Sequence, residues 1–184
     1  DCDLTGSVTV QNTVSGFTLS GFDIDDYVTF SGNSGPLVLE DLYVHGSSGI
    51  RVMNHNGSIK VNQVKAEDNN YRGASLDNTA SSSAGVEVKN SSFNFNTIVG
   101  GYYAGLTILS NGPVTLDGVS ASNNNGDGID VYDAKSLTIK NSIFSNNFTE
   151  PDSMVWGYGM FIPLGYTNAA VTVSYTHLTL PTKR

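Results

Sequence analysis

The sequence repeats one pattern of short apolar runs, and this periodicity restricts the fold more than any other feature. Five runs share one internal spacing, in which two alternating inward positions are followed by a two-residue step and two further inward positions. They begin at Leu37, Ile59, Val86, Val114 and Leu137. Alternation at a period of two indicates a strand with one buried face, and the step in the middle predicts a bend at which the strand turns a corner.

A second set of short runs follows the first, and each of its members opens with glycine. These glycines are Gly49, Gly73, Gly105, Gly128 and Gly159, while the run Val28 to Phe30 is an earlier copy without one. Glycine in the same register five times predicts a corner that either needs a positive φ or leaves no room for a Cβ.

The connections between the two sets differ in a way that favours a solenoid. From a second run to the next first run the distance is 8 to 12 residues, whereas the other connection ranges from 13 to 23 residues. Insertions on one side only are typical of stacked repeats. An antiparallel sandwich would not repeat this two-run pattern, and the frame of the leucine-rich repeat is absent. We therefore predict a parallel β-helix with a coil about every 22 to 34 residues.

Two further rows support stacking of the coils. Asparagines recur three residues beyond the last inward position of the first run, and in parallel coils their amides would form a hydrogen-bonded ladder. They are Asn69, Asn96, Asn124 and Asn147, with Ser47 in the first copy. The same alignment places Lys60 beside Glu87, and Lys89 and Lys140 beside Asp117, which are favourable cross-strand pairs.

Composition excludes some classes of function. Charged residues make up 14% of the chain and the formal net charge is -8, so a nucleic-acid phosphate backbone would be repelled and we expect no nucleic-acid partner. No run of 18 apolar residues exists, so we expect no membrane insertion. Cys2 is the single cysteine, which rules out an internal disulfide.

Both ends of the sequence predict a piece of a longer parent chain. The chain begins at Asp1 without a charged-then-apolar leader. Residues 173–184 resemble a translated sequencing adapter, so we expect a β-helix fragment over 1–172 and a non-native tail over 173–184. Without Lys183 and Arg184 the formal charge of the natural part is -8 - 2 = -10.

Two segments carry a resemblance to a known superfamily. Residues 126–133, with the sequence Gly-Asp-Gly-Ile-Asp-Val-Tyr-Asp, and residues 136–147 resemble the right-handed β-helix superfamily. This superfamily includes pectate lyases, polygalacturonases, NosD-like periplasmic proteins and repeat regions of bacterial surface proteins. The resemblance implies an all-β, right-handed parallel β-helix solenoid of about six coils, truncated at both ends, in an extracellular or cell-surface protein. It specifies the fold and not the activity.

The enzyme signatures of that superfamily are absent. The aspartate-rich elements of polygalacturonases do not occur, because Asp25-Asp26 follows Ile24 and His45 lies between Val44 and Gly46. Neither arginine before the tail, Arg51 or Arg72, lies in the Arg-x-Pro-x-x-Arg context of pectate lyases. We therefore assign no catalytic residue. The histidines His45, His55 and His177 are interpreted as unpaired in the repeat frame.

One edge of the predicted solenoid combines aromatic rings with carboxylates. The candidate ligand-binding residues are Tyr71, Tyr103, Asp127, Asp130, Trp156 and Tyr158. Aromatic rings beside carboxylates are a common way to hold sugars, so polysaccharide is the partner we expect there. The alternative is that these rings pin the long insertions onto the wall.

Calcium is a weaker hypothesis. Asp127, Asp130 and Asp133 lie within seven residues, and Ca²⁺ prefers several oxygen ligands. Alternation puts Asp130 outward and the other two in turns at opposite ends of the strand, so solvated turn aspartates are the simpler interpretation. Asp23, Asp25 and Asp26 form a similar cluster, and we predict no resident cofactor or metal.

Taken together, these features predict a structural and interaction segment of a secreted or cell-surface bacterial protein that contacts polysaccharide. The alternative is a fragment of a carbohydrate-active enzyme, either a polysaccharide lyase or a glycoside hydrolase, whose catalytic residues lie outside this chain.

Overall fold

A computed structural model of the chain describes residues 2–97, 104–148, 157–163 and 170–174, and within these residues every regular element is a β-strand. The strands are β1 (Cys2–Leu4), β2 (Val8–Gln11), β3 (Phe17–Ser31), β4 (Leu37–Met53), β5 (Ile59–Ala66), β6 (Ala74–Asp77), β7 (Val86–Lys89), β8 (Ala104–Leu109), β9 (Pro113–Asp117), β10 (Asp127–Tyr132), β11 (Ser136–Lys140), β12 (Met160–Phe161) and β13 (Ala170–Ser174). No helix of the described residues is long and apolar enough to cross a membrane.

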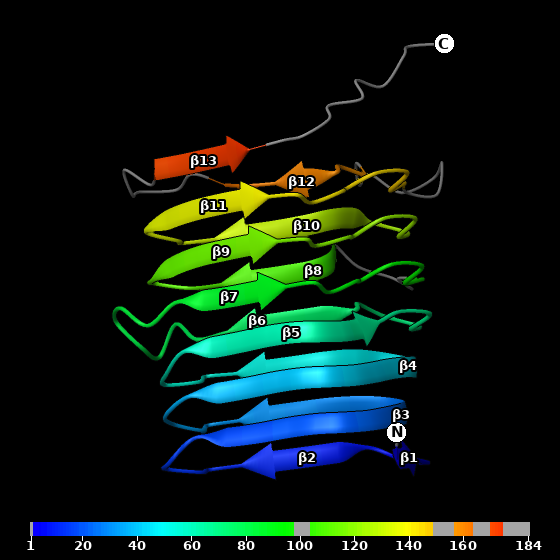
Figure 1. The fold of residues 1–184 in the computed structure, drawn as a ribbon, viewed down its shortest axis with the longest axis vertical. Coiled ribbons are helices and arrows are strands. Elements are labelled where there is room, and N and C mark those ends of the chain that lie inside the picture. The colour runs from blue at the N-terminus through cyan, green and yellow to red at the C-terminus, as the bar shows by residue number, and fades with distance from the viewer. Residues whose placement is uncertain (1, 98–103, 149–156, 164–169, 175–184) are drawn as a thin grey trace.

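The strands stack into a solenoid of about six turns whose axis is vertical in Figure 1. All pairings between the strands are parallel, and one wall is formed by β5, β7, β9, β11 and β13 and another by β6, β8, β10 and β12. The long strands β3 and β4 contribute to both walls. The predicted parallel β-solenoid is therefore confirmed.

The register agrees with the repeat read from the sequence. In the first wall the aligned residues are Leu37, Ile59, Val86, Val114 and Leu137, and in the second they are Ile50, Ala74, Leu106, Ile129 and Met160. Except for Met160 these side chains are buried and belong to one apolar core. Each large aliphatic side chain removed from water contributes roughly 1.5–3 kcal/mol, so the shared interior is the main source of stability.

The two-residue step in the first runs is a backbone corner, as predicted. The residues at this bend all have a positive φ, and they are Gly21, Asp41, Gln63, Asn90, Gly118 and Asn141. Glycine and asparagine adopt this left-handed conformation at lower cost than other residues. The bend lets one continuous strand, such as β4, cover two sides of the core.

The glycines that open the second runs are explained by close approach, because only Gly49 has a positive φ. A Cβ on Gly105 would lie 2.5 Å from Nδ2 of Asn124, and a Cβ on Gly128 would lie 2.5 Å from Nδ2 of Asn147. Gly73 meets Asn96 in the same way at 2.8 Å. At these three positions, the asparagine of the next coil occupies the space that a side chain would fill, whereas a Cβ on Gly49 or Gly159 would meet backbone carbonyls.

The predicted asparagine ladder is present. The side-chain amide of Asn69 donates to Oδ1 of Asn96 at 3.1 Å, Asn96 donates to Asn124 at 3.0 Å, and Asn124 donates to Asn147 at 3.0 Å. Each of these oxygens also accepts the backbone N–H of the preceding asparagine. Ser47 differs from the prediction, since it meets the next coil through its carbonyl, which accepts the N–H of Asn70.

A second buried polar row lies at another corner and was not predicted. Asn33, His55, Asn78 and Ser110 occupy equivalent places in successive coils and are at most 2% exposed. The side-chain amides of the asparagines donate hydrogen bonds to neighbouring backbone carbonyls. For example, Nδ2 of Asn78 donates to the carbonyl of Ala84 at 2.8 Å. Burial lowers the pKa of His55, although the carbonyls of Ser58 and Gly35 oppose the shift.

The outward charged residues and the last strand are also aligned between neighbouring coils. Lys60 lies opposite Glu87, and Asp117 lies between Lys89 and Lys140, as predicted. Strand β13 pairs with β11 and aligns Val173 with Ile139. The predicted boundary between residues 172 and 173 therefore falls inside a strand, and the nature of the tail stays a prediction.

Replacing Asn96 by alanine tests the ladder. We expect Asn96→Ala to lower the free energy of unfolding by about 1–3 kcal/mol, because the backbone and side-chain N–H groups of Asn69 lose their shared acceptor in a buried place. Urea denaturation followed by circular dichroism measures it. The control is Asn70→Ala, an exposed donor to Gly46 O, and an equal loss in both variants would contradict the assignment.

The buried histidine predicts a pH dependence of stability. Because the pKa of His55 in the fold lies below its ordinary value of 6.5, the unfolded chain binds more protons between the two values. The stability contributed by neutral His55 is thus present above about pH 6.5 and is lost as the pH falls towards the folded pKa. The variant His55→Asn carries the residue found at the equivalent position of the neighbouring coils, Asn33 and Asn78. In this variant the loss of unfolding free energy at acid pH should disappear. An unchanged slope of unfolding free energy against pH would contradict it.

Candidate functional site

The outward face of the second wall carries the candidate site. Its central row consists of Arg51, Ser75, Thr107, Asp130 and Phe161, one residue from each successive coil. Ser75, Thr107 and Asp130 point away from the core and are nevertheless at most 8% exposed. A sheltered outward row is where a ligand can be held out of bulk water.

A pair of carboxyl groups lies at the centre of this face. Asp127 is the first residue of β10, so the predicted placement of Asp127 in a turn is wrong. The carboxyl of Asp130 interacts with that of Asp127 and with the hydroxyl of Tyr132, while its buried Oδ1 has no hydrogen-bond partner among the described residues. Burial and the neighbouring carboxylate both disfavour the charged form of Asp130, so its protonated form is favoured.

Burial is the main cause of the unusual titration of this pair. It raises the pKa of Asp130 to about 7, and the neighbouring charge of Asp127 adds to the shift. Burial also raises the pKa of Asp127, although the N–H of Tyr158 donates to its Oδ1 at 2.6 Å and opposes the effect. Arg72 lowers the pKa of Asp130 by a smaller amount, which places a positive charge near the pair.

Aromatic rings form a platform beside the carboxyl pair. The ring of Tyr158 stacks on Phe161 with centroids 5.8 Å apart and planes inclined by 15°, and Phe161 meets Tyr132 edge-on at 6.4 Å. Tyr158 and Phe161 are 45% and 40% exposed, so the platform is accessible. Tyr132 and Phe161 were missed in the sequence, although Phe161 follows Gly159 by two positions as Asp130 follows Gly128.

The other candidate aromatics lie elsewhere. Tyr71 is 46% exposed, and its coil is two coils away from that of Asp130. It borders a hollow of about 350 Å³ together with Ser48, Arg51 and Arg72. Tyr103 and Trp156 lie outside the described residues. The structure thus brings Asp127, Asp130 and Tyr158 together, with Tyr71 on a neighbouring part of the solenoid.

The carboxyl pair lacks the ligand set of a metal site. No group of three or more His, Cys, Asp or Glu side chains in the described part of the chain is arranged to hold a metal. Asp133, the third member of the expected calcium cluster, is exposed in a corner with φ 60°. Two carboxyls, of which Asp130 has a raised pKa, provide fewer charged oxygens than calcium sites usually have.

Comparisons with known proteins place this geometry in a family. The sequence model described as "Right handed beta helix region" matches residues 26–179. The chain belongs to the right-handed β-helix family. Among solved structures, it is similar to the crystal structure of pectate lyase Pel9A, with 20% identity, a TM-score of 0.55 and 94% of this chain covered. The chain spans 52% of that structure, and at this identity the likeness shows the fold alone. No curated protein sequence matches the chain.

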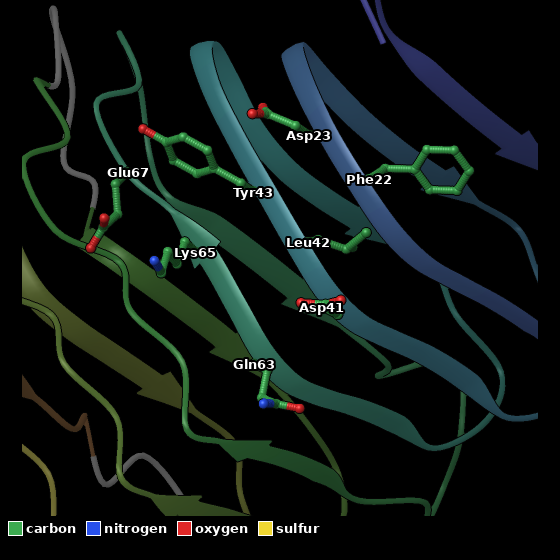
Figure 2. Close-up of a pocket in the computed structure, with 8 residues that line it drawn as sticks. All are labelled: Phe22, Asp23, Asp41, Leu42, Tyr43, Gln63, Lys65 and Glu67. Atoms are coloured by element: carbon green, nitrogen blue, oxygen red, sulfur yellow. The ribbon is translucent and has the colours of Figure 1, made fainter. Parts of the chain in front are cut away.

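The β-helix has two further hollows on a different outward side, along the backbone bend. One has a volume of about 340 Å³ and includes Asp23, Tyr43 and Glu67, and the other has a volume of about 470 Å³ and includes Asn90 and Ser92. Both are bordered by Asp41, Gln63 and Lys65, so they meet. Figure 2 shows the residues that line the first hollow. Nothing in the repeat pattern signalled the hollows, because they arise from the angle of the bend.

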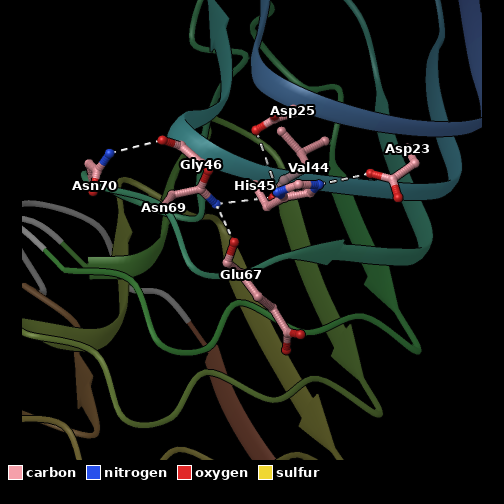
Figure 3. A network of polar contacts seen from close by, with 8 residues as sticks. All are labelled: Asp23, Asp25, Val44, His45, Gly46, Glu67, Asn69 and Asn70. Atoms are coloured by element: carbon pink, nitrogen blue, oxygen red, sulfur yellow. Dashed lines mark hydrogen bonds and ion pairs between the residues drawn. The ribbon is translucent and has the colours of Figure 1, made fainter. Parts of the chain in front are cut away.

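His45 is not unpaired, which corrects the sequence interpretation. Its Nε2 lies 2.9 Å from Oδ1 of Asp23 and its Nδ1 lies 3.7 Å from Oδ1 of Asp25 (Figure 3). The pairing follows from register, because Asp25 is aligned with His45 and Asp23 with Tyr43. With both ring nitrogens facing carboxylates, the imidazole links two coils of the β-helix and is a poor candidate for a general base.

The buried carboxyl pair predicts an opposite pH effect to that of His55. Because the pKa of Asp130 rises from 3.8 to about 7 in the fold, the folded protein binds more protons than the unfolded chain between these values. The free energy of unfolding should therefore decrease as the pH rises from about 4 to 7.

The variant Asp130→Asn removes this titration and should flatten the curve of stability against pH in that window. Exposed Asp133→Asn is the control and should leave the curve unchanged. If Asp130→Asn and the natural chain lose stability equally between pH 4 and pH 7, the raised pKa of Asp130 is wrong.

Proposed function

We propose that this β-helix is a polysaccharide-binding segment of a secreted or cell-surface protein, and that the sugar binds on the outward face of the second wall. The observation that carries this proposal is the exposed ring pair of Tyr158 and Phe161 beside the buried carboxyl pair Asp127–Asp130. A location outside the cell is supported by the resemblance to β-helix proteins of that kind.

The chemistry of the two features is complementary to a pyranose. Aromatic faces pack against the apolar C–H faces of a sugar ring. Carboxyl oxygens accept hydrogen bonds from hydroxyls, and the carboxyl of Asp127 is only partly buried beside the rings.

The shape of the face favours an extended ligand. Its central row repeats once per coil, and parallel strands are about 4.8 Å apart, so contacts recur at short regular intervals along the axis. Arg51, Arg72 and Tyr71 border a hollow on the same side of the molecule, lower in the solenoid. A polymer lying along the axis could reach both places.

Catalysis is the second candidate, and the raised pKa of Asp130 favours it because a carboxyl titrating near 7 can act as an acid at neutral pH. However, hydrolysis of glycosides uses two carboxyl groups separated by roughly 5 Å or more. Asp127 and Asp130 instead influence each other's pKa directly, and no second carboxyl is placed across a cleft from them among the described residues, so binding is the better supported function.

Glycan-array binding with single variants tests the proposal. We expect the natural chain to bind at least one polysaccharide, and Phe161→Ala to bind it about tenfold more weakly because a stacking face is lost. The matched control is Phe95→Asn, since Phe95 is a 51% exposed aromatic whose place in later coils is taken by Asn123 and Asn146. Absence of binding to neutral and acidic polysaccharides, or equal weakening in both variants, would overturn it. Release of shorter or unsaturated sugars would favour the enzyme.

A further inference from the structure

A second polar groove runs along the bend of the coils, on a side of the β-helix that the candidate site does not use. Its floor is an in-register row of outward side chains formed by Asp23, Tyr43, Lys65, Ser92 and Ser120. Four coil steps of about 4.8 Å separate the first residue from the last. The next coil carries Ile143 at the same register.

The shape of the groove is set by the backbone bend. Asp41, Gln63 and Asn90 project from the positive-φ corner beside the row, and Gly118 leaves space in the next coil. The two hollows, of about 340 and 470 Å³, each have the size of a small-ligand site and share part of their lining. Figure 2 shows Tyr43, Lys65 and Glu67 near one another and Asp41 and Gln63 at the bends of adjacent strands.

The chemistry of the lining changes along the groove. At one end, Asp23, Asp41 and Glu67 line the hollow together with Lys65. Towards the other end, Asp41 and Lys65 still border the hollow, and the residues added there are the uncharged Asn90, Ser92 and Ser120. Three carboxylates against one ammonium disfavour a polyanion.

The carboxylates also act together on Tyr43. Burial raises the pKa of Tyr43, and the charges of Asp68, Glu67 and Asp23 raise it further. The phenol therefore stays protonated and keeps both a hydroxyl donor and a ring at the charged end. The ring lies 4.5 Å from that of His45, which holds it in place.

We propose that this groove is a second binding site, which holds an extended, uncharged polysaccharide chain along the solenoid axis. Amide, hydroxyl and carboxylate groups repeated at one coil spacing match a ligand that presents hydroxyls at short regular intervals. A peptide strand is less suited, because the groove is not a free sheet edge and its lining is polar. The proposal is independent of the aromatic site.

The test is calorimetric titration of the chain with neutral hexasaccharides of glucose, mannose and xylose, and with hexagalacturonate. Ser92→Ile fills the groove with the side chain that Ile143 already carries in this row, and Gln63→Gly removes a lining group at a bend where Gly21 and Gly118 occur naturally. The matched controls are Thr115→Ile, outward on β9, and Asn141→Gly, at the same bend but outside both hollows.

We expect one neutral hexasaccharide to bind, with affinity reduced about tenfold in each groove variant and unchanged in each control and in Phe161→Ala. Binding that is lost in Phe161→Ala but kept in Ser92→Ile and Gln63→Gly would overturn the groove while leaving the aromatic site standing. Hexagalacturonate binding that the groove variants abolish would overturn the uncharged ligand. Failure of every neutral sugar to bind in the groove would overturn the proposal whatever happens at Phe161.

Discussion

Parallel stacking in register is the constraint on which the rest of this molecule depends. Every coil hydrogen-bonds to the next through backbone groups, and equivalent residues therefore lie above one another. A residue type is accepted at a position only if it is compatible with its counterparts one coil away. Aliphatic rows pack, the row from Asn69 to Asn147 forms a hydrogen-bonded chain, and Gly73, Gly105 and Gly128 leave room for those asparagines.

The same rule converts single outward residues into continuous surfaces. One surface, around Asp130, is sheltered and contains two interacting carboxyls beside exposed aromatic rings. The other, around Lys65, is an open polar groove along the bend. Neighbouring carboxylates on one strand would repel one another in either place. The raised pKa of Asp130 relieves this repulsion on β10, and His45 of the next coil relieves it between Asp23 and Asp25 on β3.

Local spacing made much of the fold predictable. The inward positions, the bend, the ladder and the pairing of Lys60 with Glu87 depend only on offsets within each repeat. The candidate site was harder to predict from the sequence. The contact of Asp127 with Asp130 depends on how the strand begins at Gly128. Tyr132 and Phe161 differ in residue type from their counterparts in other coils. The partners of His45 lie in an earlier coil that the aligned runs did not include.

Distances between spin labels on one outward row test the stacking most directly. In a Cys2→Ser background, a label at position 18 can be paired with labels at 115, 138 and 172, which lie four, five and six coil steps away along the first wall. Pulsed electron resonance should give distances that increase by about 4.8 Å for each step. Distances that do not increase with coil number would contradict parallel stacking, and with it the arrangement of both surfaces.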